Sequence, residues 1–217
     1  MGDIYRDLAG IGVEVSGVKP NRRADIERTI LHATELVNFG DRRLLGFLAS
    51  WIVVHGGLVS IGKIKHLIKT EKRGDRQVLS ALAHIALENK FHVWKPLAGK
   101  FPQRVLWDSD NTRSALELRG SDPVLIKAGV RFPAGFLRIR TSDVLPIETL
   151  AKRHLQVRLR LIFGVNPRAD AAFYLSFESL NANALKRRIG CSYEPANRII
   201  REFREAGSLA LPELNLQ

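Results

Sequence analysis

Apolar residues recur at helical spacing in several segments of this chain, and residues that favour helix starts precede many of them. In the first such segment, one helical face carries Ile26, Ile30, Ala33 and Val37. Three further segments begin after residues that often cap helix N-termini, namely Asp41, Ser60 and Asp75. This pattern predicts a series of amphipathic helices in the first part of the chain.

The middle of the chain has a different pattern. Between Phe101 and Thr141, short alternating or apolar runs are separated by Pro, Gly, Asp and Asn; the runs are RVLW, ALELR, VLIKAGV and FLRIR. Such runs are typical of strands joined by turns, and Phe91 to Trp94 also reads as a strand. Beyond them, Ile147 to Phe163 can form one long helix, whose predicted outer positions carry Lys152, Arg153, Arg158 and Arg160.

These patterns predict a mainly α fold with α+β elements. We expect an N-terminal arm at residues 1–20, a helical unit at 21–98, a β-rich connecting segment at 99–146 and a second helical unit at 147–217. The two helical units share one order of elements, which suggests a structural repeat.

The chain has an excess of positive charge. Lys and Arg number 34 against 22 Asp and Glu among 217 residues, which gives a formal charge of +12. With 45% hydrophobic residues, this is the composition of a folded protein rather than of a basic disordered tail. A basic folded protein indicates an anionic partner.

The segment from Ser179 to Leu209 carries the most specific motif. A first helix has inward-facing Leu180, Leu185 and Ile189, and Gly190 can adopt the positive φ of a tight turn. Ser192 is placed to cap a second helix with Pro195 in its first turn. The inner stripe of that helix is Ala196, Ile199, Ile200 and Phe203.

The stretch from about Asn166 to Leu211 resembles the winged helix-turn-helix domain of bacterial DNA-binding regulators. The resemblance implies that the helix from Ser192 to Ala206 enters the major groove and that a short wing follows Gly207. Arg and Asn suit guanine and adenine edges, so the expected base contacts are Tyr193, Asn197, Arg198 and Arg201. The expected phosphate contacts beside that helix are Lys186, Arg187 and Arg188.

The stretch from Asp41 to Trp94 resembles a second winged helix, with a weaker motif. Its second helix would span Ser60 to Lys69 and its third Asp75 to Glu88. The expected exposed cations, which can hold phosphates without reading sequence, are Lys63, Lys65, Lys69, Lys72, Arg73 and Arg76.

The predicted function is therefore that of a double-stranded DNA-binding protein, in the role of a cytoplasmic transcriptional regulator. The alternative is a protein-interaction module, such as an antitoxin or a phage-defence component, whose helical units only form a scaffold. RNA binding is a third option, but the 7% aromatic content offers few stacking surfaces. A homodimer is common among groove readers and remains open.

Other functional classes find little support in the residues. Asp108-Ser109-Asp110 is too short a motif for a metal-dependent enzyme and fits a turn. No histidine spacing matches a metal site, and Cys191 has no histidine nearby in sequence. The apolar run from Leu44 to Val54 is far short of the roughly 20 residues that cross a bilayer. We therefore expect no enzymatic activity, no cofactor, no metal and no membrane partner.

Overall fold

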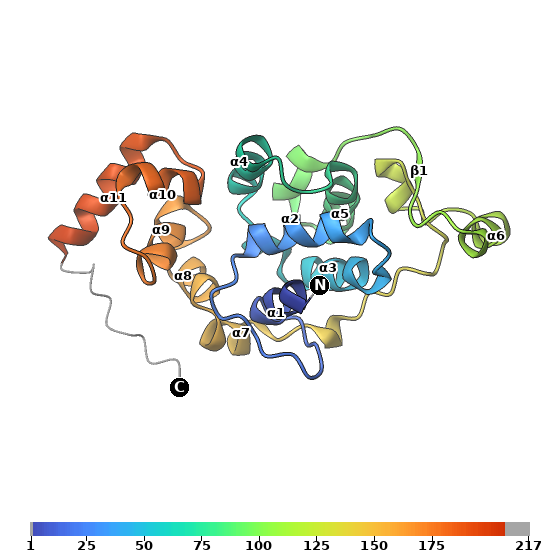
Figure 1. Ribbon diagram of the computed structural model, residues 1–217, viewed down its shortest axis with the longest axis horizontal. Coiled ribbons are helices and arrows are strands. Elements are labelled where there is room, and N and C mark those ends of the chain that lie inside the picture. The colour runs from blue at the N-terminus through green and yellow to red at the C-terminus, as the bar shows by residue number, and fades with distance from the viewer. Residues whose placement is uncertain (1, 207–217) are drawn as a thin grey trace.

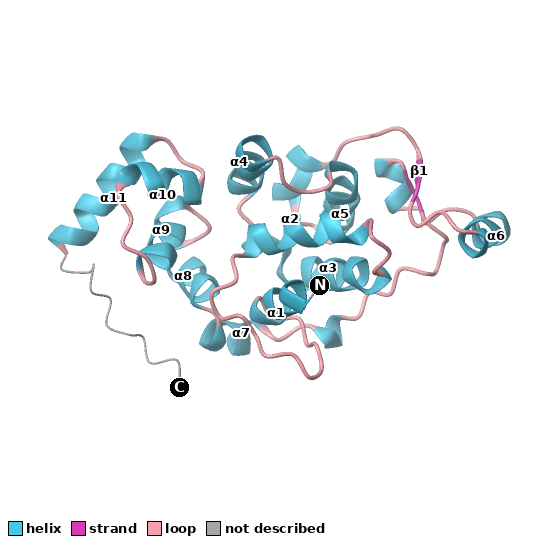
Figure 2. Cartoon of the chain, viewed as in Figure 1, coloured by secondary structure: helices cyan, strands magenta, loops and turns pink. Residues whose placement is uncertain are grey.

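The chain is mainly helical in the computed structural model, which describes residues 2–206 (Figures 1 and 2). The first five helices are α1 (Gly2–Gly10), α2 (Ile26–Val37), α3 (Arg42–His55), α4 (Ile61–Glu71) and α5 (Arg76–Glu88). The predicted helices of this region are thus confirmed.

Side-chain caps fix the starts of these helices. Asp41 accepts a hydrogen bond from the backbone N–H of Arg43, and Ser60 accepts one from Lys63. Asp75 accepts two, from the first turn of α5. Each cap satisfies backbone donors that have no partner inside the helix, so the predicted helix starts at these three residues are confirmed.

The middle of the chain is not β-rich, and that prediction is wrong. Its two strands, β1 (Arg104–Val105) and β2 (Val130–Arg131), form one small parallel pair in which Arg104 lies opposite Val130. The run ALELR lies instead in helix α6 (Asp110–Arg119), because Ser109 caps that helix. Short 3-10 helices cover Gly56–Leu58, His92–Leu97, Leu125–Ala128 and Thr141–Asp143. Short apolar runs cannot by themselves distinguish strands from buried helical turns.

The last five helices are α7 (Ile147–Arg153), α8 (Leu155–Phe163), α9 (Pro167–Leu175), α10 (Ala182–Ile189) and α11 (Tyr193–Glu205). The predicted single helix over 147–163 is broken at His154, which has extended backbone angles. There the ring Nδ1 of His154 accepts the N–H of Val157 at 3.4 Å, and Nε2 donates to the carbonyl of Ala24 at 2.8 Å. His154 therefore caps α8 while it ties the break to the first part of the chain.

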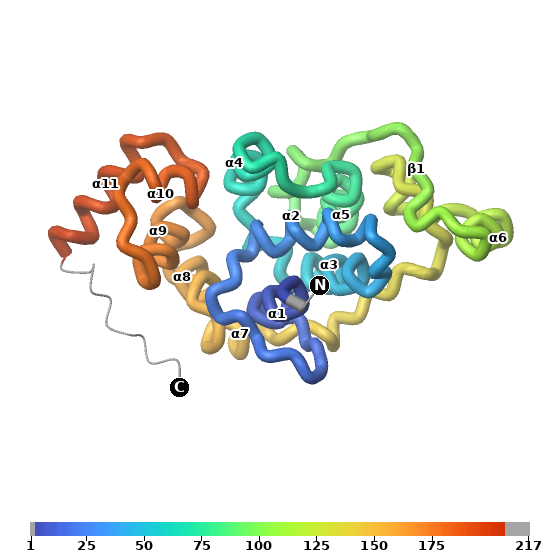
Figure 3. The backbone as a smooth tube through the Cα atoms, in the orientation of Figure 1, coloured from blue at the N-terminus to red at the C-terminus, as the bar shows by residue number. Residues whose placement is uncertain are grey.

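The buried apolar residues form two clusters. The first packs α1 to α5 together with the middle segment, and that segment contributes Leu106, Leu125, Ala128, Val130 and Phe132. The second packs α8 to α11. Figure 1 shows α9, α10 and α11 together at one end of the long axis, and Figure 3 traces the chain into them through α7 and α8. The division into four parts at residues 20, 98 and 146 stays a prediction.

Candidate nucleic-acid interface

Helices α10 and α11 meet through a tight turn, as the sequence pattern predicts. Gly190 ends α10 in the left-handed conformation, with φ of 73°, and its N–H donates to the carbonyl of Lys186 at 3.0 Å. Five apolar side chains between the two helices are buried, namely Leu185, Ile189, Ala196, Ile199 and Ile200. Ser192 stands at the N-cap position of α11, but its side chain makes no capping hydrogen bond.

The outer face of α11 is polar and accessible. The residues predicted to contact bases are all exposed: Tyr193, Asn197, Arg198 and Arg201. Two exposed ion pairs lie along this face, from Arg198 to Glu202 and from Arg201 to Glu205, each at 3.8 Å. Such pairs contribute little free energy, so the guanidinium groups can exchange them for an anionic ligand.

The basic residues of α10 differ in their surroundings. Arg187 is exposed, and the ammonium group of Lys186 lies 6.0 Å from the centre of the Tyr193 ring. Arg188 pairs with Glu178 at 3.1 Å and is half-buried. Of the three predicted phosphate contacts, Lys186 therefore lies beside the start of α11, Arg188 is directed toward Glu178, and Arg187 is the one that is exposed.

The structure describes no winged-helix unit within residues 2–206. The predicted strand at Phe91 to Trp94 is wrong, because that stretch enters the 3-10 helix His92–Leu97, where the indole of Trp94 is buried and donates to the carbonyl of Gly56 at 2.9 Å. The wing and terminal strand predicted after Gly207 lie outside the described residues.

A second basic surface lies where α4 turns into α5. Its cations border a surface hollow of about 530 Å³ and are Lys65, Lys69, Lys72, Arg73 and Arg76, which together we call the basic hollow. Arg73 pairs with Glu35 at 3.0 Å. Within residues 2–206 the other four make no ion pair, so their charges are available to a partner.

Lys63 does not belong to this surface, and the expectation that it faces outward is wrong. Its side chain is fully buried, and Nζ forms an ion pair with Asp25 and lies 3.1 Å from Glu27. Lys63 is on the face of α4 that also carries Ile64 and Leu67, both buried. Lys65 and Lys69 project from the other side of the helix, because they are two and six residues further along a 3.6-residue period.

Lys63 is part of a buried group of charges, here called the charged seam, which consists of Asp25, Glu27, Lys63, Arg160 and Asp170. Arg160 makes a bidentate contact to Glu27 at 2.7 and 2.9 Å and reaches Asp170 at 2.6 Å. The predicted outward position of Arg160 is therefore wrong. The seam joins residues of α2 and α4 to residues of α8 and α9, so it lies where the two apolar clusters meet.

Neutral polar groups add further hydrogen bonds to the seam, although the Nε atom of Arg160 is buried without a hydrogen-bond partner among the described residues. Gln156 donates to Asp25 at 3.2 Å and to Asp170 at 2.9 Å, and it accepts from the N–H of Ile26 at 3.0 Å. The hydroxyl of Tyr174 donates to Asp25 at 2.8 Å. Buried charges are tolerated only when they are paired and hydrogen-bonded in this way.

Burial and pairing shift the pKa values of the seam in different directions. Burial alone would raise the pKa of Asp25, but the adjacent Lys63 holds it well below the ordinary value. Burial dominates at Asp170 and raises its pKa. At the neighbouring His154, burial lowers the pKa to about 4, so the imidazole is neutral at pH 7. That neutral form is the one whose Nδ1 can accept a hydrogen bond.

The turn between α10 and α11 lies directly against α4. A Cβ atom placed on Gly190 would lie 3.0 Å from the Cβ of His66, and His66 stands between Lys65 and Leu67 on α4. Together with the charged seam, this contact sets α10 and α11 beside the helix that carries part of the basic hollow. Two basic surfaces from distant parts of the sequence are thereby held in one packed arrangement.

Sequence reasoning missed the charged seam. Its members are separated by up to 145 positions, from Asp25 to Asp170, and no local spacing connects them. The only local sign is that Asp25 and Glu27 stand at the start of α2, where acidic residues also serve as caps and favour the helix dipole. Because these roles are common, the two acidic residues give no reason to predict ion pairs with Lys63 and Arg160.

Within residues 2–206, no group of three or more His, Cys, Asp or Glu side chains could hold a metal ion. No single helix in the same range is long and apolar enough to cross a membrane. The segments Arg42–Leu58 and Ile61–Glu71 together have the required length and apolar composition, but the chain bends by 117° between them. Comparison with models of protein families, with curated proteins and with solved structures finds no match to this chain.

Proposed function

We propose that this protein binds double-stranded DNA and acts as a transcriptional regulator. The observation that carries the proposal is the close approach of Gly190 to His66, since the turn between α10 and α11 then lies against α4, the helix that contributes Lys65 and Lys69 to the basic hollow. Helix α11 enters the major groove, and the hollow binds phosphates of the flanking backbone. Two such contacts on one duplex give a higher affinity than either surface alone.

The exposed side chains of α11 suit base edges. Arg198 and Arg201 can each make two hydrogen bonds to guanine, and Asn197 can do the same with adenine. Tyr193 and the neighbouring Lys186 lie at the start of the helix, where the phosphate backbone would border the groove. In this proposal, α11 recognises the DNA sequence, and the basic residues of α10 and of the basic hollow add affinity that does not depend on sequence.

Fluorescence anisotropy with a mixed-sequence DNA duplex, a single strand and an RNA duplex, each at two salt concentrations, tests the proposal. We expect the duplex DNA to be preferred and its binding to weaken steeply with salt. Failure to bind any duplex DNA at low salt would contradict the proposal.

Once a preferred DNA sequence has been selected, single variants separate base contacts from phosphate contacts. Arg198→Ala should reduce specific affinity by about 1 to 3 kcal/mol if it pairs with guanine. Arg153→Ala, which removes an exposed charge from α7 outside both surfaces, is the matched control. Equal losses on every DNA sequence would show that Arg198 contacts phosphate rather than a base.

One observation favours the second candidate function, a protein-interaction module of the antitoxin or phage-defence kind. The end of α8 exposes Leu161, Ile162 and Phe163, and Val165 follows them. Neighbouring exposed apolar residues are typical of a surface that a protein partner covers. A stoichiometric partner that stays bound at high salt would support this function, because a complex held by ion pairs with nucleic acid would dissociate.

A further inference from the structure

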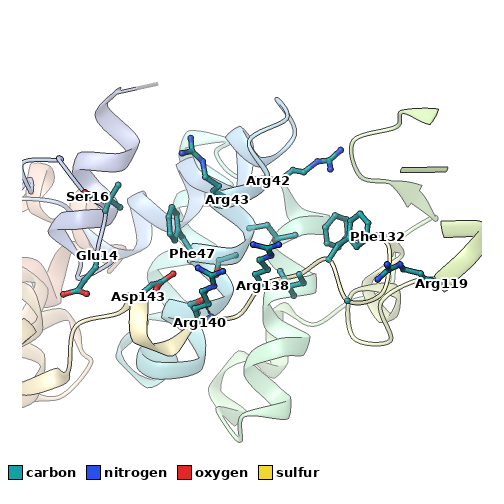
Figure 4. A pocket seen from close by; sticks show the side chains of 17 residues that line it. Glu14, Ser16, Arg42, Arg43, Phe47, Arg119, Phe132, Arg138, Arg140 and Asp143 are labelled. Atoms are coloured by element: carbon teal, nitrogen blue, oxygen red, sulfur yellow. Dashed lines mark hydrogen bonds between the residues drawn. The ribbon is translucent and has the colours of Figure 1, made fainter. Parts of the chain in front are cut away.

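An arginine-rich cleft lies on a different part of the molecule from the proposed DNA surface. It has a volume of about 950 Å³, and five of its lining residues are cations, namely Arg42, Arg43, Arg119, Arg138 and Arg140. Aromatic rings also line it, from Phe47, Phe132 and Phe136. Figure 4 shows the acidic residues Glu14 and Asp143 at one end and Arg119 at the other, with Arg138 and Arg140 between them.

The backbone of the cleft is held in place by helix α3. A Cβ atom on Gly46 would lie 2.9 Å from the carbonyl oxygen of Arg138, so the two chain segments touch at a position where only glycine fits. Two positions further, the N–H of Arg140 donates to the hydroxyl of Ser50 at 2.8 Å. The segment is thus fixed across α3, and its two arginines are two positions apart, a spacing that places side chains on one side of an extended chain.

The arginines of the cleft differ in the interactions that their guanidinium groups already make within the protein. Arg43 pairs with Asp41, and the guanidinium of Arg42 lies 5.7 Å from the ring centre of Trp107. Arg119 lies over the ring of Phe136 at 5.4 Å. Arg138 and Arg140 are exposed, and neither side chain has an ion pair within residues 2–206. Arg138 and Arg140 therefore offer two guanidinium groups without ion pairs to the cleft, with the acidic residues Glu14 and Asp143 at one end of it.

We propose that this cleft binds a nucleotide, with phosphates on Arg138 and Arg140 and the base on an aromatic wall. A planar guanidinium binds phosphate oxygens in pairs, which suits a defined phosphate group better than a lysine ammonium does. Phe136 is 37% exposed, and the accessible part of its ring is a surface on which a base can stack. The volume falls within the range of small-molecule sites, about 300 to 1,000 Å³.

The position of the cleft separates it from the DNA-binding surface. In Figure 1, the segment that leads into α7 runs along the edge of the molecule opposite to α4. The cleft therefore lies away from α4, which carries part of the basic hollow. The nucleotide is therefore a second ligand rather than part of the DNA contact, and its binding does not depend on the proposed function.

Isothermal titration calorimetry of the full chain at about 150 mM salt, where long-range charge attraction is screened, tests the proposal. The probes are ATP, GTP and inorganic tripolyphosphate, because tripolyphosphate carries the charge without a base. We expect at least one nucleotide to bind more tightly than tripolyphosphate. Equal affinities for all three, or no binding at millimolar concentration, would overturn the proposal.

Variants then assign the two parts of the nucleotide. Replacing both Arg138 and Arg140 with Lys keeps the charge but removes the paired hydrogen bonds, and we expect about a tenfold loss of nucleotide affinity. Phe136→Ala should weaken the nucleotide about tenfold and leave tripolyphosphate unchanged. Full affinity in the lysine variant would mean that the cleft attracts anions only by charge and would overturn the nucleotide assignment.

A reciprocal control separates this proposal from the DNA proposal. Lys65→Gln with Lys69→Gln should weaken DNA binding and leave nucleotide affinity unchanged, whereas the lysine variant of the cleft should do the reverse. Loss of DNA affinity in the cleft variant, with nucleotide binding intact, would assign the cleft to nucleic acid and overturn the proposal. Circular dichroism of each variant, with the wild-type helical signal expected, excludes unfolding as the cause of a loss.

Discussion

Helix α4 contributes lysines to two regions that use charge in opposite ways. Lys63 lies in the charged seam, fully buried between carboxylates, whereas Lys65 and Lys69 line the basic hollow, exposed and without ion pairs within the described residues. The three residues are of one type and lie within two turns of one helix. Their chemical surroundings differ because the two faces of the helix meet different partners.

This difference shows that burial, rather than residue type, decides the role of a basic residue here. In the seam, desolvation would disfavour the charge of Lys63, but Asp25 and Glu27 reverse that effect and raise its pKa. The charged Lys63 therefore stabilises the contact between the two apolar clusters through its ion pairs. In the hollow, Lys65 and Lys69 are exposed and make no ion pair within the described residues, so they can bind an anion.

The largest expected effect comes from breaking the seam. Lys63→Met leaves the buried carboxylate of Asp25 without an ion-pair partner, whereas Glu27 and Asp170 keep Arg160, and we expect a loss of about 3 to 5 kcal/mol in the free energy of unfolding. Lys65→Met, two residues away on the exposed face, is the matched control and should change stability by less than about 0.5 kcal/mol. Urea denaturation measures the free energy of unfolding of both variants, and equal values would show that the ion pairs of Lys63 in the seam contribute nothing to stability.

The next largest effect is the loss of stability at acidic pH. Because burial lowers the pKa of His154 from 6.5 to about 4, the unfolded chain takes up a proton below pH 6.5 that the folded chain does not. Stability should therefore fall between about pH 6.5 and 4, by roughly 3 kcal/mol in all. Protonation of Asp25, whose pKa is depressed, should reduce it further at lower pH.

His154→Asn separates these two contributions. The asparagine oxygen can cap α8 in place of Nδ1 but does not titrate. Thermal denaturation against pH should then lack the contribution of His154, so stability should fall less between pH 6.5 and 4 than in the wild type, while the decrease due to Asp25 at lower pH remains. An unchanged slope in this variant would contradict the assignment to His154.

Substitution at the turn that brings the two proposed DNA-binding surfaces together should have a smaller effect on stability. Gly190→Ala forces a side chain into a left-handed backbone and against His66, so we expect a loss of about 1 to 2 kcal/mol and weaker DNA binding. Gly62→Ala is the control, because a Cβ atom there meets nothing within 4 Å and alanine favours the helix. It should stabilise the protein slightly, as measured by thermal denaturation.

The smallest effect on stability is expected in the basic hollow. Lys65→Gln and Lys69→Gln should each leave the free energy of unfolding unchanged within about 0.5 kcal/mol. Each should also lower the slope of log K against log salt for duplex DNA by about 0.9, because one fewer counterion is released. A salt slope equal to that of the wild type would remove that residue from the DNA contact.

The helical parts of the fold were accessible from local sequence signals. Caps at Asp41, Ser60 and Asp75, together with the apolar periodicity that follows them, place α3, α4 and α5 correctly. The middle segment was misread because its short runs fit two interpretations. Ser109 and the buried Ala115 and Leu116 make one of them a helix, and the choice depends on packing against the rest of the chain.

The candidate sites were only partly accessible. The pattern around Gly190 predicts the turn and the exposed face of α11, since both follow from spacing within thirty residues. The arginine cleft left only a weak signal, the Arg-Ile-Arg spacing at Arg138 and Arg140, and the long-range pairing at Gly46 is not readable from sequence. When two charged residues far apart in the sequence form an ion pair, the sequence around each of them does not identify the partner.

The sequence by itself determined where most helices begin, which of their faces are apolar, and that the chain is strongly basic. Tertiary structure alone decided which basic residues are buried in the seam, which stay in water, and how the turn at Gly190 lies against α4. The reason is physical. Capping and periodicity act within a few residues, whereas burial and ion pairing depend on contacts between residues such as Glu27 and Arg160, which are 133 positions apart.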